Sequence, residues 1–476
     1  MSEKEMMYDS ILARSFSKQE QKKLRYVAIF CCFLIALSFC TVFKPYLGPL
    51  PVLNLRLSID VSDLKMLIVK DTSTSHMDST NSQRIEVSDA IPKKIDELVC
   101  NITERSDLCE INHDIRIDGR SATIYFASTH EHEANSSWNI RPYARKYDRV
   151  AMSRAKEWSV KSVQQLQLPH CTQNHSIPAV VFSSGGYSGN HFHDFSDILI
   201  PLYITSRQFN GQVQFIVTDK HSWWINKFQN VIRNLSNYDI IDIDKETDIH
   251  CFTRGIVGLK RHDRELRIDP STSPYYSIKD FREFIRSSYS LKKATAIKLK
   301  DGDQNKIKPG LLIISRKRTR TFTNTGKIAE MGRKLGFQVV VTEAESNLSR
   351  FAETVNSCDV FLGVHGAGLT NMIFLPERAV FIQVVPFGGF EWLARTDYEE
   401  PSKQMNMRYL EYKIKIEESS LLQQYPIDHQ VIKDPSSIGK QGWKVFRSVY
   451  MERQNVQLDL NRFRSTLLKA LELLHQ

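Results

Sequence analysis

Short hydrophobic runs alternate with longer stretches of helical periodicity through residues 96–300. The strand-like runs are residues 122–126, 179–182, 213–217 and 238–243. Helix-compatible stretches fall between them, at residues 194–209 and 222–235. Short buried strands that alternate with helices of this length indicate a parallel α/β sheet.

The same alternation begins again after a polar, lysine-rich stretch at residues 291–310. Strands are expected at residues 311–314, 337–341, 360–364 and 379–385, and helices at residues 326–335, 348–358, 369–374 and 458–474. This order is typical of a doubly wound nucleotide-binding unit. The pattern therefore predicts two α/β domains, residues 96–300 and 301–476, with a ligand cleft between their strand ends.

An uncharged apolar run at residues 26–43 is near the short end of the about 17–25 residues that cross a bilayer. Lys22, Lys23 and Arg25 precede it, which places the N-terminus in the cytosol. A cleaved signal peptide is the alternative, but its leader would be long and no small-x-small cleavage site follows. We expect a cytosolic tail at residues 1–25, a signal anchor at 26–43 and a flexible stem at 44–95.

Cysteines and glycosylation sequons agree with a secretory-pathway lumen. The cysteines after the apolar run are Cys100, Cys109, Cys171, Cys251 and Cys358. Cys100 and Cys109 are close in sequence and fit a disulfide in an oxidising compartment. A Cys171–Cys251 pair is left open, and Cys358 is expected to be a buried free thiol. Asn-x-Ser/Thr sequons occur at Asn101, Asn135, Asn174, Asn234 and Asn347.

The net charge of +10 and the isoelectric point near 9.0 allow an anionic partner. The basic residues are scattered, which favours a solvated surface over a single binding face. The sequence contains no zinc-finger spacing or RNA-binding motif, so a nucleic-acid partner has no support.

A glycine-rich stretch, Gly363-Val-His-Gly-Ala-Gly368, follows the strand expected at residues 360–364. Glycine lets main-chain N–H groups approach a ligand without a Cβ in the way. The following helix adds partial positive charge at its N-terminus, so a diphosphate is the expected guest. His365 can donate to a phosphate oxygen, with a charge set by the local pH. The alternative is a tight turn with a satisfied histidine.

Residues 315–320, Ser-Arg-Lys-Arg-Thr-Arg, open directly off another strand end. Arginine forks match phosphate oxygens bidentately, which supports an anion site at this edge. A solvated charge run is the alternative.

The stretch SSGGYSGNHFHDFSD, residues 183–197, also follows a strand. His193 and Asp197 are four residues apart and share a helix face. A histidine backed by a carboxylate is a usual general base. A metal site and a helix cap are the alternatives, and the metal site is less favoured because no third ligand has a recognisable spacing.

The stretches GVHGAGLTNMIFLP, SSGGYSGNHFHDFSDILIPLYIT, ISRKRTRTFTN and QNVQLDLNRF resemble plant glycosyltransferase family 61, from about Cys100 to the C-terminus. That family includes xylan arabinosyl- and xylosyltransferases, and animal relatives transfer N-acetylglucosamine. The resemblance implies a GT-B fold with two facing Rossmann-like domains. It also implies that the donor binds in the C-terminal domain and the acceptor in the N-terminal one. Members of the family are expected to invert the anomeric centre without a metal or other cofactor.

The family motifs carry over residue by residue. Asn190, His193 and Asp197 match Asn-x-x-His-x-x-x-Asp; Arg316, Arg320 and Asn324 match Ser-Arg-x-x-x-Arg-x-x-x-Asn; His365, Gly366, Ala367 and Gly368 match His-Gly-Ala-Gly. His191 and Asp194 do not recur in the animal enzymes. The resemblance and the residue chemistry both place the donor site at the arginines and the glycine turn. Glu343 or Glu345, just past the strand expected at residues 337–341, is placed to hold the donor ribose. His193, steadied by Asp197, is the expected base, and Asn190 and Asp194 lie on the acceptor side.

We therefore expect a single-pass type II Golgi membrane enzyme. It would transfer xylose or arabinofuranose from a UDP-sugar to a xylan-type cell-wall polysaccharide, with no nucleic-acid partner. The sugar, the acceptor and the linkage stay open. One alternative is transfer of N-acetylglucosamine or xylose to protein-linked glycans. A second is a metal-dependent GT-A enzyme that uses Asp242 and Asp244, or Asp301 and Asp303. Less favoured are a serine hydrolase and a non-catalytic carbohydrate-binding protein.

Overall fold

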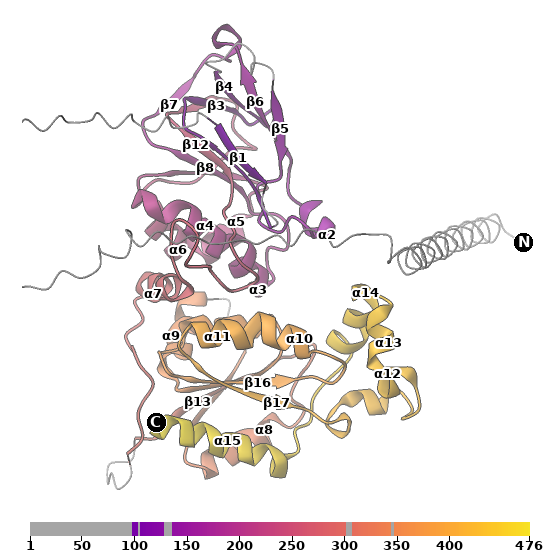
Figure 1. Cartoon of the computed structure of the whole chain (residues 1–476). Coiled ribbons are helices and arrows are strands. Elements are labelled where there is room, and N and C mark those ends of the chain that lie inside the picture. Colours follow the sequence, from indigo (N-terminus) through magenta and orange to yellow (C-terminus); the bar gives the residue numbers. More distant parts are fainter. Residues whose placement is uncertain (1–97, 103–104, 128–135, 301–306, 344–346) are drawn as a thin grey trace, which may run out of the picture. The chain divides into compact units, whose positions relative to one another are not determined.

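The structure is a computed structural model that describes residues 98–102, 105–127, 136–300, 307–343 and 347–476 (Figure 1). All the described residues belong to one compact unit. The predicted tail, membrane anchor and stem lie outside the described residues. Within the described ranges, no helix combines the length and the apolarity needed to cross a bilayer.

The first sheet has six strands in the order β1-β2-β12-β8-β9-β10. Their bounds are β1 Leu98–Ile102, β2 Asp107–Ile111, β12 Gly255–Gly258, β8 Ala179–Ser183, β9 Gln214–Thr218 and β10 Ile241–Asp242. Strands β12, β8, β9 and β10 are mutually parallel, as predicted, whereas β1 and β2 pair antiparallel at the edge. The strand expected at residues 238–243 is reduced to the two residues of β10.

A second sheet was not foreseen. Its order is β5-β6-β4-β3-β11-β7, with β5 Ser137–Ile140, β6 Trp158–Val163, β4 Thr123–Ala127, β3 Ile115–Asp118, β11 Ile249–Phe252 and β7 Gln173–His175. Three of its five pairings are antiparallel, so the prediction of one parallel sheet for this half is wrong here. Strands β3 and β6 alternate buried with half-buried side chains, which is typical of a sheet with one face in the core. A hydrophobic core that includes Ile117, Trp158 and Val181 joins the two sheets.

Helices pack on the other face of the first sheet. They are α3 His191–His193, the π-helical segment η3 Asp194–Leu199, α4 Ile200–Ser206, η4 Arg207–Phe209, α5 Ser222–Lys227, α6 Gln229–Leu235 and α7 Ile278–Ser288. Two short helices, α2 Arg149–Met152 and η2 Gln165–Gln167, lie in the loops. The core under these helices continues into the C-terminal half, because Phe182 and Phe195 belong to one cluster with Phe361 and Phe374.

The third sheet is fully parallel, as predicted, in the order β14-β13-β15-β16-β17. Its strands are β14 Gln338–Thr342, β13 Gly310–Ile314, β15 Val360–Val364, β16 Val380–Val385 and β17 Arg408–Lys413. Helices α8 Thr325–Lys334 and α15 Leu460–His475 cover one face, and α9 Leu348–Ser357 and the 3-10 helix η5 Ala367–Phe374 cover the other (Figure 1). The apolar segment after the glycine turn is therefore a 3-10 helix.

The strand order places a topological switch point in this sheet. Strand β13 comes first in the chain, β14 lies on one side of it and β15 on the other. Open α/β sheets bind ligands in the crevice beyond the carboxyl ends of the two strands at such a point. The loops that leave these ends are the basic stretch 315–320 and the glycine turn 365–368, the two segments singled out by the sequence.

The remaining helices follow β16 and β17. They are α10 Glu391–Ala394, the π-helical η6 Arg395–Glu399, α11 Glu400–Gln404, η7 Ile416–Glu418, η8 Ser420–Gln423, α12 Gln430–Lys433, α13 Pro435–Lys440, α14 Trp443–Phe446 and the π-helical η9 Arg447–Met451. Most of them surround a separate core that includes Phe390, Phe446 and Tyr450.

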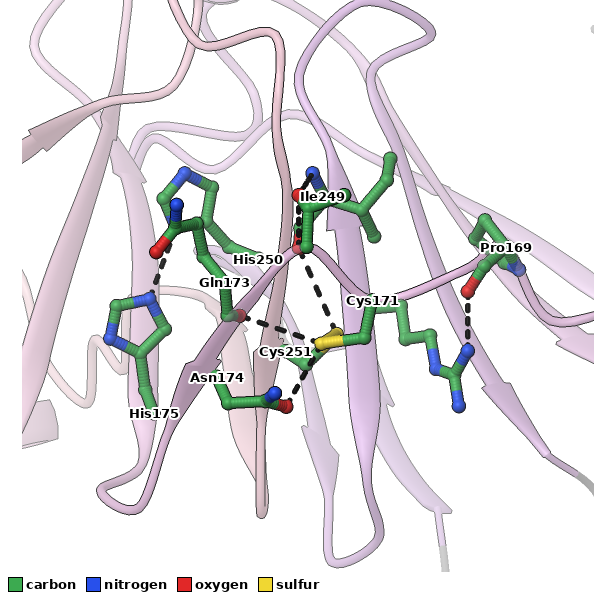
Figure 2. Close-up of a disulfide and its surroundings, with 10 residues drawn as sticks. Pro169, Cys171, Gln173, Asn174, His175, Ile249, His250 and Cys251 are labelled. Atoms are coloured by element: carbon green, nitrogen blue, oxygen red, sulfur yellow. Dashed lines mark hydrogen bonds between the residues drawn. A yellow bond between two sulfur atoms is a disulfide. The ribbon is translucent and has the colours of Figure 1, made fainter.

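Two disulfides tie the N-terminal sheets. Cys100 and Cys109 are direct cross-strand neighbours on β1 and β2 and are bonded to each other. Cys171 is bonded to Cys251 of β11, beside the hydrogen-bonded pair His175 and His250 (Figure 2). Cys358 is buried and free. The sequon residues Asn174, Asn234 and Asn347 are exposed, whereas Asn135 and the side chain of Asn101 lie outside what the structure describes.

Candidate active site

The glycine turn after β15 is held open against two arginines. Gly366 has a φ of 143°, and a Cβ at this position would lie 2.7 Å from Arg320 Nη1 and 3.0 Å from Arg316 Nη1. The hydroxyl of Tyr398 donates to the carbonyl oxygen of Gly366 at 2.9 Å. Only a residue without a side chain lets both guanidinium groups approach the main chain this closely.

The two arginines lack counter-charges. Arg320 has a left-handed φ of 52°, is 8% exposed, and donates from Nη1 to the carbonyl oxygen of His365 at 2.8 Å. In the part of the chain that the structure describes, Nε of Arg320 has no hydrogen-bond partner, and the guanidinium of Arg316 bonds to Thr319. Among the described residues, neither guanidinium forms an ion pair with a carboxylate. Burial and the charge of Arg316 lower the pKa of Arg320 to about 9, so it is still mostly protonated at pH 7. Such a pair is costly to bury without an anion.

His365 is a neutral hydrogen-bond donor in this site. Its Nδ1 lies 2.8 Å from Nε2 of Gln383, whose Oε1 accepts from the hydroxyl of Tyr409 at 2.9 Å. This network assigns the imidazole proton to Nε2. Burial, with the charges of Arg320 and Arg316, lowers the pKa of His365 to about 3. The expectation that the charge of His365 follows the local pH is therefore wrong near neutrality. The imidazole stays neutral because it is buried and because Arg316 and Arg320 oppose a further positive charge.

Asp397 faces this histidine and was not foreseen. Its Oδ2 lies 4.0 Å from Nε2 of His365, and its side chain is 15% exposed. Burial, followed by the charge of Glu265, raises the pKa of Asp397 from 3.8 to about 8. The carboxyl is therefore mostly protonated at pH 7. No motif surrounds this position, and only the packing of η6 against the turn after β15 brings it to the site.

On the N-terminal side, His193 and Asp197 form the expected pair. Nδ1 of His193 lies 2.9 Å from Oδ2 of Asp197, one turn along the segment from α3 into η3. The Nε2 of His193 has no hydrogen-bond partner among the described residues. The ring of Tyr187 packs against the imidazole ring of His193, with the two ring centroids 4.7 Å apart. A π-helical insertion at this point is frequent at functional sites, because it rotates the side chains that follow.

Asp197 is fully buried and satisfied by five donors. Besides His193, they are Tyr143 Oη at 3.0 Å, Ser196 Oγ at 2.7 Å, Arg145 Nη1 at 3.1 Å and Arg261 Nη1 at 2.9 Å. Burial alone would raise the pKa of this carboxyl. The hydrogen bond from His193 and the charges of Arg145 and Arg261 prevail and hold it well below the usual range. Asp197 is thus ionised at every physiological pH.

The loop after β8 is shaped around Tyr143. Gly186 has a φ of 60°, and a Cβ there would lie 2.2 Å from the Tyr143 ring. The Tyr143 oxygen accepts from the main-chain N–H of Tyr187 at 3.1 Å while its proton goes to Asp197. Asn190 caps α3 by accepting from the N–H of Phe192. The glycines of this stretch therefore orient the carboxylate that supports His193.

A chain of buried polar contacts connects this loop to the glycine turn. Asp194 accepts from Gly189 N and Trp224 Nε1, and it pairs with Lys227 Nζ at 2.9 Å. Lys227 Nζ lies 3.3 Å from Nδ1 of His191, and Nε2 of His191 lies 3.0 Å from Oδ1 of Asn371. Asn371 donates in turn to the carbonyl oxygen of Gly368 at 2.9 Å. Burial and Lys227 lower the pKa of His191 to about 3, so this bridge is a neutral imidazole.

Other predicted residues are placed differently. Asn324 uses both ends of its amide on the main chain of Leu458, at 2.8 and 3.2 Å, and so holds the segment before α15. Glu343 pairs with Lys317 at 2.8 Å. Glu345, Asp301 and Asp303 lie outside the described residues. Ala367 and Gly368 begin η5, next to the arginines.

The Asp242–Asp244 pair is occupied by lysines. Lys245 Nζ lies 3.0 Å from Asp242, and Lys156 Nζ lies 2.7 Å from Asp244. The two carboxylates line a cavity of about 600 Å³ at the carboxyl ends of β8, β9 and β10. Arg154, at the same cavity, stacks on the Tyr187 ring that contacts His193. In the part of the chain that the structure describes, no three His, Cys, Asp or Glu side chains come together as a metal site.

Comparisons with known proteins match these segments. Residues 191–382, from the His193 loop to β16, match the family Glycosyltransferase 61. The chain is 46% identical to alpha-1,3-arabinosyltransferase XAT3 of Oryza sativa subsp. japonica, over 77% of this chain and 64% of that protein. It therefore spans less than two thirds of that relative's length.

Two further relatives are matched over most of their length. Beta-1,2-xylosyltransferase XYXT1 of Oryza sativa subsp. japonica is 40% identical, over 80% of this chain and 87% of that protein. Xylan glycosyltransferase MUCI21 of Arabidopsis thaliana is 34% identical, over 95% of this chain and 92% of that protein. The chain belongs to glycosyltransferase family 61.

Proposed function

We propose that this protein is an inverting glycosyltransferase that moves a pentose, xylose or arabinofuranose, from a UDP-sugar to a xylan-type polysaccharide. The observation that carries the proposal is the Arg316–Arg320 pair, set against Gly366 at a switch point and lacking carboxylate partners. The names of the relatives supply the sugar and acceptor classes, since they are arabinosyl- and xylosyltransferases and a xylan glycosyltransferase.

The two halves of the described unit take separate roles in this proposal. The third sheet and its helices, residues 301–476, form the donor domain of a GT-B enzyme, and residues 96–300 form the acceptor domain. Support comes from the doubly wound order of the third sheet, which opens a crevice at β13 and β15. The series of polar contacts from Asp194 to Gly368 connects the predicted acceptor region with the predicted donor region.

The donor diphosphate binds between the arginines and the glycine turn. Arg316 and Arg320 supply two positive charges, His365 donates from Nε2, and the free amides of the turn supply further donors. Negative charge that develops on the β-phosphate as the sugar departs is stabilised there by groups already in place. In this proposal the arginines replace a metal ion, and no other cofactor takes part.

A protonated Asp397 also favours binding of the diphosphate. An ionised Asp397, with its Oδ2 4.0 Å from Nε2 of His365, would repel the negatively charged diphosphate. A neutral carboxyl leaves the field of the arginines intact and offers one more proton donor at the site.

His193 serves as the general base. Its Nδ1–H is held by ionised Asp197, which leaves the lone pair of Nε2 for the acceptor hydroxyl. The acceptor oxygen bonds to C1 of the sugar while the bond from C1 to the β-phosphate oxygen breaks, with inversion at C1. The hydroxyl proton moves to Nε2, and Asp197 stabilises the imidazolium that results.

The enzyme is further proposed to be a type II membrane protein of the Golgi. The apolar run at residues 26–43 supports this, together with two disulfides and exposed sequons in the part described. Protease treatment of sealed Golgi vesicles is expected to leave residues 98–476 intact until detergent is added. Degradation of that part without detergent would contradict the orientation.

Replacing Gly366 by Ala is expected to weaken UDP binding about tenfold or more, since the new Cβ displaces Arg316 and Arg320. Isothermal titration of the full-length protein with UDP measures the effect. Gly326→Ala, on α8, is the matched control, because nothing lies within 4 Å of a Cβ at this position. Both variants should keep the unfolding temperature within a few degrees. Equal UDP affinity in the two variants would contradict the donor site.

His193→Ala is expected to lower kcat by about 10²- to 10⁴-fold and leave UDP affinity unchanged, because only proton transfer is lost. The assay follows UDP release from UDP-xylose and UDP-arabinofuranose with xylo-oligosaccharide acceptors. Thr354→Ala, on helix α9, serves as a control for a substitution outside the site. Full activity in the His193 variant would reject the base, and no turnover of either donor by the unchanged protein would reject the pentosyltransferase function.

Asp397→Asn is expected to change the pH dependence of stability. The folded pKa of about 8 exceeds the usual 3.8, so the folded state retains a proton that the unfolded state loses. This stability is present at low pH and is lost as the pH rises from about 4 through about 8. The unfolding temperature of the unchanged protein should therefore fall relative to that of the variant between pH 5 and 9. Parallel curves over this range would refute a buried neutral Asp397.

A further inference from the structure

A second cavity, of about 520 Å³, is lined by other residues than those assigned to the donor site. Its lining is strongly basic, with Arg105, Arg145, Lys146, Arg149 and Arg261 against one carboxylate, Asp148. It lies in the N-terminal half except for one aromatic side chain, Trp443, which the C-terminal half contributes from α14. The cavity is therefore complete only when both halves of the unit are in place.

The cavity shares residues with the support of the general base. Arg145 and Arg261 both line it, and both bond to Oδ1 of Asp197, whose Oδ2 holds His193. An occupant that contacts these two arginines lies one carboxylate away from the histidine.

One buried donor at this cavity is left without a hydrogen bond. The side chain of Arg261 is 3% exposed, and its Nη2 has no hydrogen-bond partner. Glu265 approaches that nitrogen only to 3.7 Å. A buried N–H group without a hydrogen-bond partner is unusual and calls for an explanation. An oxygen of a ligand in the cavity is one acceptor that this nitrogen could bind.

The rim has free positive charge and exposed aromatic rings. Arg149 is exposed and forms no ion pair with any carboxylate that the structure describes. Tyr147 is 75% exposed and Trp443 is 56% exposed, although both are large aromatic residues. A pocket with apolar rings and a few directed polar groups suits a ligand that has one apolar face and a polar edge. A pyranose ring has both.

Charge selects among such ligands. Arg145 and Arg261 are engaged by Asp197, and Lys146 is 2.7 Å from Asp107. The charge of Arg149 remains, with its planar fork directed by no protein carboxylate. A guanidinium fork matches the two oxygens of a carboxylate and discriminates against an uncharged group.

We propose that this cavity binds a carboxylate-bearing sugar of the acceptor chain, a uronic acid unit, and so directs a neighbouring hydroxyl toward His193. The proposal rests on the glycosyltransferase function and names the acceptor class of the same enzyme. The other anion in the reaction, the diphosphate of the donor, is placed in the site at Gly366, and the experiment separates the two.

The test measures binding of two oligosaccharides to the full-length protein by isothermal titration. One is a xylo-oligosaccharide that bears a single glucuronic acid branch, and the other is the unbranched xylo-oligosaccharide of the same backbone length. The acidic ligand is expected to bind about tenfold more tightly at low salt, and raising the salt should reduce this preference. Equal affinities would overturn the proposal.

Two variants locate the effect. Arg149→Gln is expected to abolish the preference for the acidic ligand, and Trp443→Ala to weaken both ligands about fivefold, with UDP affinity unchanged in each. Arg333→Gln, at an exposed position on α8, is the control for loss of one positive charge. An unchanged preference in Arg149→Gln, or a fall in UDP affinity in either variant, would show that the cavity does not bind the acid branch.

Turnover separates this proposal from the proposed function. If the protein transfers a pentose and the KM for acidic and neutral acceptors is the same, the enzyme assignment stands and the cavity assignment fails. If no donor is turned over while the preference for the acidic ligand still depends on Arg149, the cavity assignment stands as a glycan-binding site and the enzyme assignment fails.

Discussion

The contact of two guanidinium groups with the bare α-carbon of Gly366 is the constraint on which the rest of the site depends. Arg320 is buried with an unused Nε, and Arg316 lies beside it without a carboxylate partner in the described chain. The nearby groups are neutral for different reasons: burial and the charges of the arginines lower the pKa of His365, whereas burial and the charge of Glu265 raise the pKa of Asp397. These observations support the proposal that the two arginines bind an anion from outside the protein.

The opposite side of the site has the reverse charge arrangement. Asp197 is a buried anion surrounded by five donors, and two arginines compensate it. This surplus of donors keeps the carboxylate ionised and the His193 ring fixed, so that Nε2 is the free atom. The same two arginines form one wall of the basic cavity. In the two proposals, orientation of the base and recognition of an acidic acceptor therefore depend on shared side chains.

The two sides are coupled through contacts that cross the unit. His191 bridges Lys227 and Asn371, and Asn371 holds the carbonyl oxygen of Gly368. Arg282 of α7, itself buried, donates to the carbonyl oxygens of Leu375 and Met405, at the end of η5 and beyond α11. A common hydrophobic core lies under both. The glycine turn is therefore held by contacts from the N-terminal half as well as by its own sheet.

Local sequence determined the elements and the chemistry that lies within single segments. The parallel strands of the third sheet, the glycine turn, the arginines after β13 and the His193–Asp197 pair could be predicted, because each depends on spacing along a few residues. Partners from distant segments could not be. Asp397 stands in no motif, and Arg261 lies in the charged run KRHDRELR, which resembles an ordinary solvated surface. Asp397 is buried against His365, more than 30 positions away, and Arg261 against Asp197, more than 60 positions away. The periodicity of hydrophobic residues carries no information about such distant contacts. The pairing of strands into a second, mostly antiparallel sheet, and the protonation states of His365 and Asp397, were likewise decided by tertiary packing, since both depend on which groups exclude water from one another.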